Sequence, residues 1–321
     1  MNDNNPQRWF TPQLTQDFVY ALAAPAGFSH SQTCFAARQS GLYISEDGGS
    51  TWQSAYASLN LDAPLSTTCL ALSPNYATEA DLLAGVPGFI MRSEDGGKSW
   101  GAIPLPYASS RSPAVPTALA ISADYSKDGI LFAGTNEDGV LRSADRGRTW
   151  SAWNFGLVDF NILSLAISPS FSKDETLYAG TGSGLFCSRN GGKSWKELNL
   201  PAGYVPVLSL AISPDFERDG ILLAGTETDG LFISSDRGQS WQRLGEKEIQ
   251  GIINQIILSP GFPATGEVLV AHENTVLRSS DGGNTWSVLL EAEIAALAAY
   301  RTEAGDLSLL VGLVDGSVKR I

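Results

Sequence analysis

The feature that most constrains the fold of this chain is an eight-residue motif that recurs six times. Its pattern is Ser-x-Asp-x-Gly-x-Ser/Thr-Trp, and one copy carries Asn in place of Asp. The copies end at Trp52, Trp100, Trp150, Trp195, Trp241 and Trp286. Since they recur about every 47 residues, the 321 residues of the chain accommodate about seven units of this kind.

Each unit also contains three short apolar runs upstream of the motif. In the unit that contains Trp195, these runs are LSLAIS from Leu163, TLYAGT from Thr176 and GLFCS from Gly184. Short apolar runs bounded by Gly, Pro, Asp or Ser are typical of buried antiparallel strands, and the motif Trp is expected to begin a fourth. Four antiparallel strands repeated seven times predict an all-β, seven-bladed β-propeller that occupies residues 1–321 as one domain.

The seventh unit, residues 294–321, lacks both the motif and a fourth strand. Residues 8–11 (RWFT) precede the first apolar run with the phase of a fourth strand. We therefore expect them to supply the outer strand of the last blade. This pairing would close the ring and remove unpaired backbone groups at its two ends.

A second repeated segment joins the first and second strands of most units; SPSFSKDE, which starts at Ser168, is one example. Its Pro and Asp residues favour turns. An aromatic residue recurs in its middle and is expected to wedge between blades. These aromatic residues are Tyr76, Tyr125, Phe171, Phe216 and Phe262.

The eight-residue motif resembles the Asp-box, or BNR repeat, of sialidases, sortilin-type receptors, some β-glucanases and photosystem II assembly factors. The six copies extend this resemblance over essentially the whole chain. It implies a propeller whose boxes lie on the face opposite the ligand site. The motif carboxylates are expected to be structural, because they can accept backbone N–H bonds within a tight hairpin. The residues assigned this role are Asp47, Asp95, Asp145, Asn190, Asp236 and Asp281.

Propeller geometry places the loops between second and third strands on the same face as the linkers between blades. We call this the loop face. Its segments break the repeat, and irregular loops on a rigid scaffold are where binding residues tend to lie. The predicted binding residues are Arg38, Tyr107, Arg111, Asn136, Glu137, Asp138, Trp153, Phe155, Tyr204, Glu227, Asp229, His272, Glu273 and Asp315.

Charge excludes several classes of partner. The chain has 21 Lys and Arg against 34 Asp and Glu, a net charge of −13, which argues against nucleic acid and anionic membranes. No run is long enough to span a bilayer, and no secretory signal precedes the first strand, so a cytoplasmic location is expected. Two histidines, three scattered cysteines and no calcium-loop pattern predict neither a metal site nor a cofactor. The cysteines are expected to be buried.

These observations favour a non-catalytic propeller that presents its loops to a protein partner, with a glycan as the less favoured ligand. Acidic residues on the loop face would attract a basic peptide surface, and its aromatic residues would anchor the partner. The alternative is a glycoside hydrolase or lyase that uses two loop carboxylates, such as Asp138 and Asp229. The Arg-Ile-Pro segment of sialidases and a Ser-His-Asp arrangement are both missing, so no catalytic residue is assigned.

Overall fold

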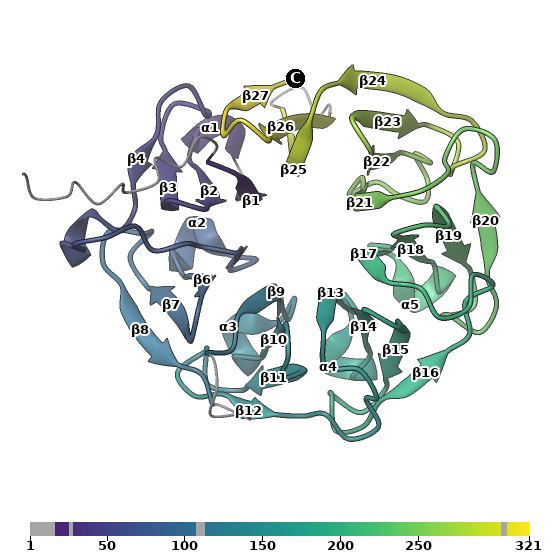
Figure 1. Ribbon diagram of the computed structural model, residues 1–321, viewed down its shortest axis with the longest axis horizontal. Helices are drawn as coiled ribbons and strands as arrows, with labels where there is room; N and C mark the ends of the chain where they lie inside the picture. Colours follow the sequence, from purple (N-terminus) through teal and green to yellow (C-terminus); the bar gives the residue numbers. More distant parts are fainter. Residues whose placement is uncertain (1–16, 26–27, 107–112, 303–306) are drawn as a thin grey trace, which may run out of the picture.

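The strands of the chain form seven sheets around a central axis, as Figure 1 shows. The structure, a computed structural model, describes residues 17–25, 28–106, 113–302 and 307–321. Within these ranges six sheets have four antiparallel strands and the seventh has three. The predicted all-β, seven-bladed β-propeller is therefore confirmed.

The blades follow one another along the chain, and the strands of each blade lie in sequence order from the axis outward. Blades one to three contain β1 (Val19–Ala23), β2 (Cys34–Arg38), β3 (Gly41–Ser45), β4 (Gln53–Ser54), β5 (Cys69–Leu72), β6 (Leu82–Val86), β7 (Phe89–Ser93), β8 (Gly101–Pro104), β9 (Pro116–Ile121), β10 (Leu131–Thr135), β11 (Val140–Ser143) and β12 (Ser151–Ala152). Blades four and five contain β13 (Ile162–Ile167), β14 (Leu177–Thr181), β15 (Gly184–Ser188), β16 (Lys196–Leu198), β17 (Val207–Ile212), β18 (Leu222–Thr226), β19 (Leu231–Ser234) and β20 (Gln242–Leu244). Blades six and seven contain β21 (Ile253–Leu258), β22 (Val268–His272), β23 (Thr275–Ser279), β24 (Ser287–Glu291), β25 (Ile294–Arg301), β26 (Leu307–Leu313) and β27 (Val318–Arg320).

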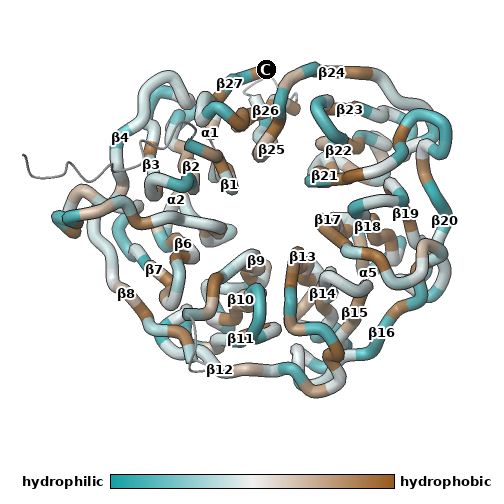
Figure 2. Tube along the Cα trace, in the orientation of Figure 1, coloured by the Kyte–Doolittle hydropathy of each residue, from teal (hydrophilic) through white to brown (hydrophobic). Residues whose placement is uncertain are grey.

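Hydrophobic clusters fill the joints between blades. Inner strands such as β13 and β17 are mostly hydrophobic, whereas outer strands such as β16 and β20 are hydrophilic (Figure 2). The aromatic residues of the connecting segments pack against the second strand of the preceding blade. The rings of Phe171 and Phe132 lie 5.6 Å apart, and those of Phe216 and Tyr178 lie 6.1 Å apart, both edge to face. The predicted aromatic wedge is confirmed.

These connecting segments are one-turn helices rather than simple turns. They are α1 (Phe28–Ser31), α2 (Tyr76–Glu79), α3 (Tyr125–Asp128), α4 (Phe171–Asp174) and α5 (Phe216–Asp219); a short 3-10 helix, η1 (Ala57–Leu59), lies in a linker. Helix α5 ends at Gly220, whose φ of +61° is left-handed and whose N–H donates to the Phe216 carbonyl. Gly is favoured at such an end because it has no Cβ. Four residues are too few to show helical periodicity, so the pattern of turn residues concealed them.

Side chains of the inner strands join consecutive blades by hydrogen bonds. Thr117 Oγ1 donates to the Ile162 carbonyl at 2.6 Å, and Ser164 Oγ donates to the Val207 carbonyl at 3.0 Å. Ser209 Oγ repeats the arrangement with the next blade at 3.0 Å. A hydroxyl near the start of an inner strand therefore satisfies a carbonyl that the neighbouring sheet leaves free.

Blades one and seven are in contact and close the ring. Val19, Phe28, Tyr300 and Leu310 share one buried cluster, and the rings of Phe28 and Tyr300 lie 4.4 Å apart. In the described residues, β27 pairs with β26 along one edge only. The outer strand expected from residues 8–11 lies outside the described residues and stays a prediction, as does the assignment of residues 1–321 to one domain.

The Asp-box is a hairpin built around one carboxylate. In blade one, Asp47 Oδ1 accepts the backbone N–H of Ser50 at 3.0 Å and of Thr51 at 2.8 Å. Thr51 Oγ1 donates to Asp47 Oδ2 at 2.6 Å, and Ser45 Oγ donates to Asp47 Oδ1. The carboxylate thus satisfies donors that a tight turn would otherwise leave unpaired. These bonds fit the structural role assigned to the motif.

The outer strands begin one residue after the motif Trp and not at the Trp itself. Trp286 illustrates the reason, because its indole N–H donates to the Gly283 carbonyl at 3.0 Å. The Trp therefore still belongs to the hairpin, and β24 starts at Ser287. The motif glycines have positive φ as expected; at Gly238, φ is +83° and a Cβ would lie 2.7 Å from the Leu198 side chain.

We expect the boxes to make the stability of the fold dependent on acid pH. Hydrogen bonds from the hydroxyls of Thr51, Ser240 and Thr285 lower the pKa of Asp47, Asp236 and Asp281 to about 2. Because these folded-state values lie below the unfolded value of about 3.9, the stabilisation is complete above that pH and is lost as the pH falls toward 2. Thermal melting between pH 6 and pH 2 measures this loss.

The triple variant Asp47→Asn/Asp236→Asn/Asp281→Asn is the matched control for this prediction. Asn190 occupies the same position in blade four, where its Oδ1 accepts the Ser194 N–H at 2.9 Å and its Nδ2 donates to Ser194 Oγ at 2.8 Å. Asn does not titrate, so the variant should lose less melting temperature below pH 4 than the parent. Parallel pH profiles for the two proteins would contradict the assignment.

Candidate functional site

The loops between second and third strands lie against the linkers between blades. The Gly139 N–H donates to the Phe160 carbonyl at 3.0 Å, and the Gly182 N–H donates to the Asn161 carbonyl at 3.1 Å. In blade five, the Glu227 N–H donates to the Pro206 carbonyl at 3.0 Å. Each of these loops is thus held by an adjacent linker, and the two sets share one face as predicted.

The linkers differ greatly in length. Residues 55–68 join blades one and two, and residues 153–161 join blades three and four, whereas residues 292 and 293 alone join blades six and seven. The loop face is therefore built up over the first blades and low over the sixth and seventh. This asymmetry is superimposed on seven similar blades.

Large apolar side chains are exposed on the two linkers that flank blade four. Phe155 is 80 % exposed, Val158 79 % and Phe160 44 % on the first linker, and Tyr204 is 82 % exposed on the second. Burying a residue of this size stabilises a protein by about 1.5–3 kcal/mol, so leaving several of them in water is costly. Of the predicted aromatic anchors in the described residues, Phe155 and Tyr204 are the ones free to contact a partner.

The acidic residues of the loop face divide into exposed and buried ones. Glu137, Glu227, Glu273 and Asp315 are exposed, and Asp229 is half-buried. The hydroxyl and backbone N–H of Ser317 bond to Asp315 and lower the pKa of that carboxyl.

Asp138 differs from this expectation because it is 6 % exposed. Its N–H donates to Thr135 Oγ1 at 3.0 Å, and its carbonyl accepts the Asn154 side-chain amide at 2.7 Å. The backbone of Asp138 therefore shapes the loop of blade three. Its expected place on an exposed acidic rim was wrong.

Three other predicted binding residues contact the protein itself. Arg38 lies 3.8 Å from Asp17 and stacks over the Tyr43 ring. Asn136 Oδ1 accepts the Val115 N–H, and the His272 ring Nε2 lies 2.5 Å from the Gln250 carbonyl. Arg38 packs within blade one, and the other two side chains hold neighbouring linkers in place.

Trp153 lies between blades three and four. Its ring packs against the Arg142 guanidinium at 4.5 Å and adjoins Gly192, in the Asp-box of blade four. Its carbonyl accepts the Trp195 indole N–H at 2.8 Å. These contacts explain a tryptophan that lies outside the repeat as part of the joint between two blades.

The remaining calculations of chemistry from the sequence concern metals and catalysis. Tyr107 and Arg111 lie outside the described residues. Within those residues, no three His, Cys, Asp or Glu side chains are grouped so as to hold a metal ion. Asp138 and Asp229, named for a glycosidase, belong to blades three and five, and blade four separates them. All three cysteines are buried and unpaired, as expected.

Sequence comparison relates the chain to photosystem assembly factors. Residues 7–156 match the family model described as "Photosynthesis system II assembly factor YCF48". A photosystem II assembly lipoprotein, Ycf48 of Synechococcus sp. (strain CC9902), is 29% identical over 107 residues, which are 33% of this chain and 29% of the relative. The chain thus matches less than a third of the length of that curated protein.

This relative also corrects the expected cytoplasmic location. The matching protein is a lipoprotein, which points to a lipoprotein or to a lumenal or periplasmic setting. Among the described residues, no helix has the length and apolar character that crossing a bilayer requires.

Solved structures with this fold include binding proteins and enzymes. A structure described as YCF48 bound to D1 peptide has a TM-score of 0.66 at 18% identity and covers 96% of this chain and 94% of that one. The GH74 enzyme of Niastella koreensis has a TM-score of 0.73 at 16% identity and covers 95% of this chain and 52% of the enzyme. The GH74 xyloglucanase of Xanthomonas campestris has a TM-score of 0.70 at 16% identity, with 95% and 52% covered. At these identities the likeness concerns the fold.

Proposed function

Because the chain is an Asp-box (BNR-repeat) β-propeller of seven blades, we propose that it is a protein-binding assembly factor. In this proposal the loop face holds a polypeptide segment of the partner. The names of the YCF48 family and of the structure with a D1 peptide support a protein partner. They make a photosystem II subunit the first partner to test.

The observation that carries the proposal is the exposure of Phe155, Val158 and Tyr204 on two neighbouring linkers. Exposed apolar groups that gather on one face commonly mark protein interaction sites. Aromatic side chains contribute most to such interfaces, because they bury a large area at a small cost in conformational entropy. The blades beneath hold the linkers in place, which reduces the cost of ordering them.

Charge indicates the chemistry of the bound segment. Glu137, Glu227 and Glu246 are exposed on loops and linkers of the same face. They would attract lysine or arginine residues and speed association at low salt. We therefore expect the partner segment to carry apolar residues flanked by basic ones.

The variant Phe155→Ser/Tyr204→Ser tests the loop face. We expect it to reduce binding at least tenfold, because each exposed aromatic anchor contributes on the order of 1–2 kcal/mol to an interface. Partner binding is measured by affinity capture from solubilised membranes of the native host, with photosystem II subunits quantified by mass spectrometry. The parent should enrich at least one of these subunits.

Val288→Ser/Leu289→Ser is the matched control, because both side chains are exposed on the outer strand β24, at the edge of the disc. It removes a similar apolar area while leaving the loop face intact, so capture should stay at the parent level. Equal capture by the parent and the loop-face variant would refute the proposed site. Loss of capture in both variants would show that the apolar area, and not the loop face, drives association.

A further inference from the structure

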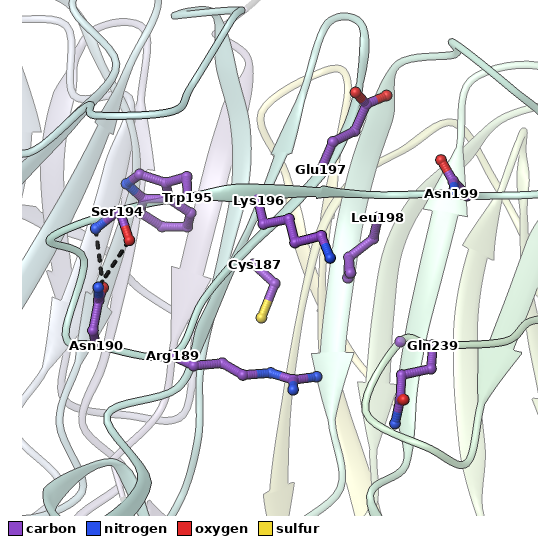
Figure 3. Close-up of a pocket in the computed structure, with 11 residues that line it drawn as sticks. Cys187, Arg189, Asn190, Ser194, Trp195, Lys196, Glu197, Leu198, Asn199 and Gln239 are labelled. Carbon is purple, nitrogen blue, oxygen red and sulfur yellow. Dashed lines mark hydrogen bonds between the residues drawn. The ribbon is translucent and has the colours of Figure 1, made fainter.

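A recess of about 520 Å³ lies on the circumference of the disc, outside the loop face. It separates β16, the outer strand of blade four, from the Asp-box hairpin of blade five (Figure 3). Its volume is in the range of ligand sites. The side chains that matter for its chemistry are Cys187, Arg189, Asn190, Lys196, Leu198 and Asn199.

The recess exists because blade four has a short side chain where the other blades have long ones. Cys187 pairs with Tyr178 on the second strand of its blade. The residues in the corresponding register of the other blades are Ile44, Arg92, Arg142, Ile233, Arg278 and Arg320. Cysteine is the smallest of this set, so the space beside β16 stays open.

Blade four also differs from the other boxes in charge. Asn190 replaces the aspartate and keeps its hydrogen bonds, so the hairpin retains its shape without the negative charge. Arg189, Lys193 and Lys196 lie in this hairpin or directly after it. Throughout the described part of the chain, exposed cations such as Lys173 and Arg218 have carboxylate partners, whereas none of these three forms an ion pair.

The one carboxylate beside the recess does not neutralise these cations. Glu197 follows Lys196 on β16, and successive side chains of a strand point to opposite faces of the sheet. In Figure 3, Arg189 and Lys196 extend into the space that the hairpins enclose, while Glu197 points away from them. A protein with a net charge of −13 therefore has a locally cationic recess.

We propose that this recess binds an acidic peptide segment of a partner protein through its side-chain carboxylates. The Arg189 guanidinium can hold a carboxylate with two parallel N–H bonds, and the Lys196 ammonium supplies a second charge. The Asn199 amide adds a neutral donor, and Leu198 provides an apolar wall for the methylenes of a glutamate side chain. This surface differs from the loop face in both place and sign of charge, so it would select a different segment.

Fluorescence anisotropy with labelled hexaglutamate at low ionic strength tests the recess, with hexaglutamine as the uncharged probe. We expect the parent to bind hexaglutamate and not hexaglutamine. Arg189→Gln/Lys196→Gln should weaken binding at least tenfold, because it removes both charge-assisted contacts. Asn190→Asp should weaken it about threefold by adding one nearby negative charge. Free glutamate as a competitor separates recognition of a peptide from recognition of any carboxylate.

Two further variants separate the recess from general attraction to lysine. Cys187→Ile, which copies blades one and five, fills the space without changing the charge and should weaken binding at least fivefold. Lys98→Gln removes the lysine at the position of Lys193 in the box of blade two and should leave binding unchanged. The natural aspartate of five other boxes makes Asn190→Asp compatible with folding, and melting curves check each protein.

Failure of the parent to bind hexaglutamate at millimolar concentration would overturn the proposal. Binding that is equal in the parent, Asn190→Asp and Cys187→Ile would also overturn it. An equal loss in Lys98→Gln would reduce the effect to unspecific attraction. None of these outcomes depends on the loop face, whose own variant leaves the recess intact.

Discussion

Replacing Arg92 with isoleucine is expected to lower the free energy of unfolding by about 3–5 kcal/mol, the usual cost of leaving a buried charge without its partner. Arg92 Nη2 lies 2.9 Å from Asp81 Oδ2, and the side chains are 6% and 3% exposed. The Tyr125 hydroxyl of the next blade donates to the same carboxylate oxygen at 2.8 Å. Burial lowers the pKa of Arg92, but the hydrogen bond to Asp81 outweighs it and raises the pKa overall.

Blade five shows how the same joint can be built without charges. It carries Ile221 and Ile233 at the positions of Asp81 and Arg92, and Phe262 follows at the position of Tyr125. The variant Asp81→Ile/Arg92→Ile/Tyr125→Phe should therefore recover most of the stability lost in Arg92→Ile. Urea unfolding of the two variants and the parent measures this. If the triple variant were less stable than the single one, the charged network would itself be the main stabilising contact.

Deleting residues 1–12 is expected to lower the melting temperature by at least about 10 °C and to promote aggregation, because β27 would keep an unpaired edge. The expectation comes from the phase of residues 8–11 and from the single edge along which β27 pairs in the described residues. Differential scanning calorimetry and light scattering give the two readouts.

Deleting residues 1–7 is the matched control, because it retains the expected strand at residues 8–11. That protein should melt within a few degrees of the parent. If the longer deletion also melts at the parent temperature, the two ends of the chain do not share a sheet. The ring would then be held closed by the Phe28 and Tyr300 cluster alone.

The architecture was predictable because each blade repeats its own instructions. The box needs only residues within one hairpin, so Ser45, Asp47 and Thr51 can be recognised from their spacing. The period of the motif then counts the blades. The wedge formed by Phe171 and Phe216 was also predictable, since an aromatic residue that recurs in every unit must occupy the same joint each time.

The candidate site was harder to predict because exposure depends on segments that are distant in sequence. Asp138 is buried by a linker that follows it, through Asn154. Trp153 resembles an interface anchor in sequence, but the box of the next blade covers its ring. Phe155 and Tyr204 were identified correctly as exposed candidates, yet sequence alone could not separate them from Trp153.

The recess in blade four was missed for a different reason. The replacement of aspartate by Asn190 is visible in the motif, but its consequence depends on Cys187 in the neighbouring strand. Only the register of β14 and β15 aligns Cys187 with the long side chains of other blades. One substitution removes a charge and the other removes volume, and both changes meet only in the folded blade.

The unequal linkers have a consequence for stoichiometry. Seven equivalent blades would offer a ligand seven interchangeable rotational settings on the disc. With tall segments such as residues 55–68 on one side and only residues 292 and 293 on the other, those settings are no longer alike. A single molecule should consequently dock in one orientation, at a ratio of one to one, despite the pseudosymmetry beneath it.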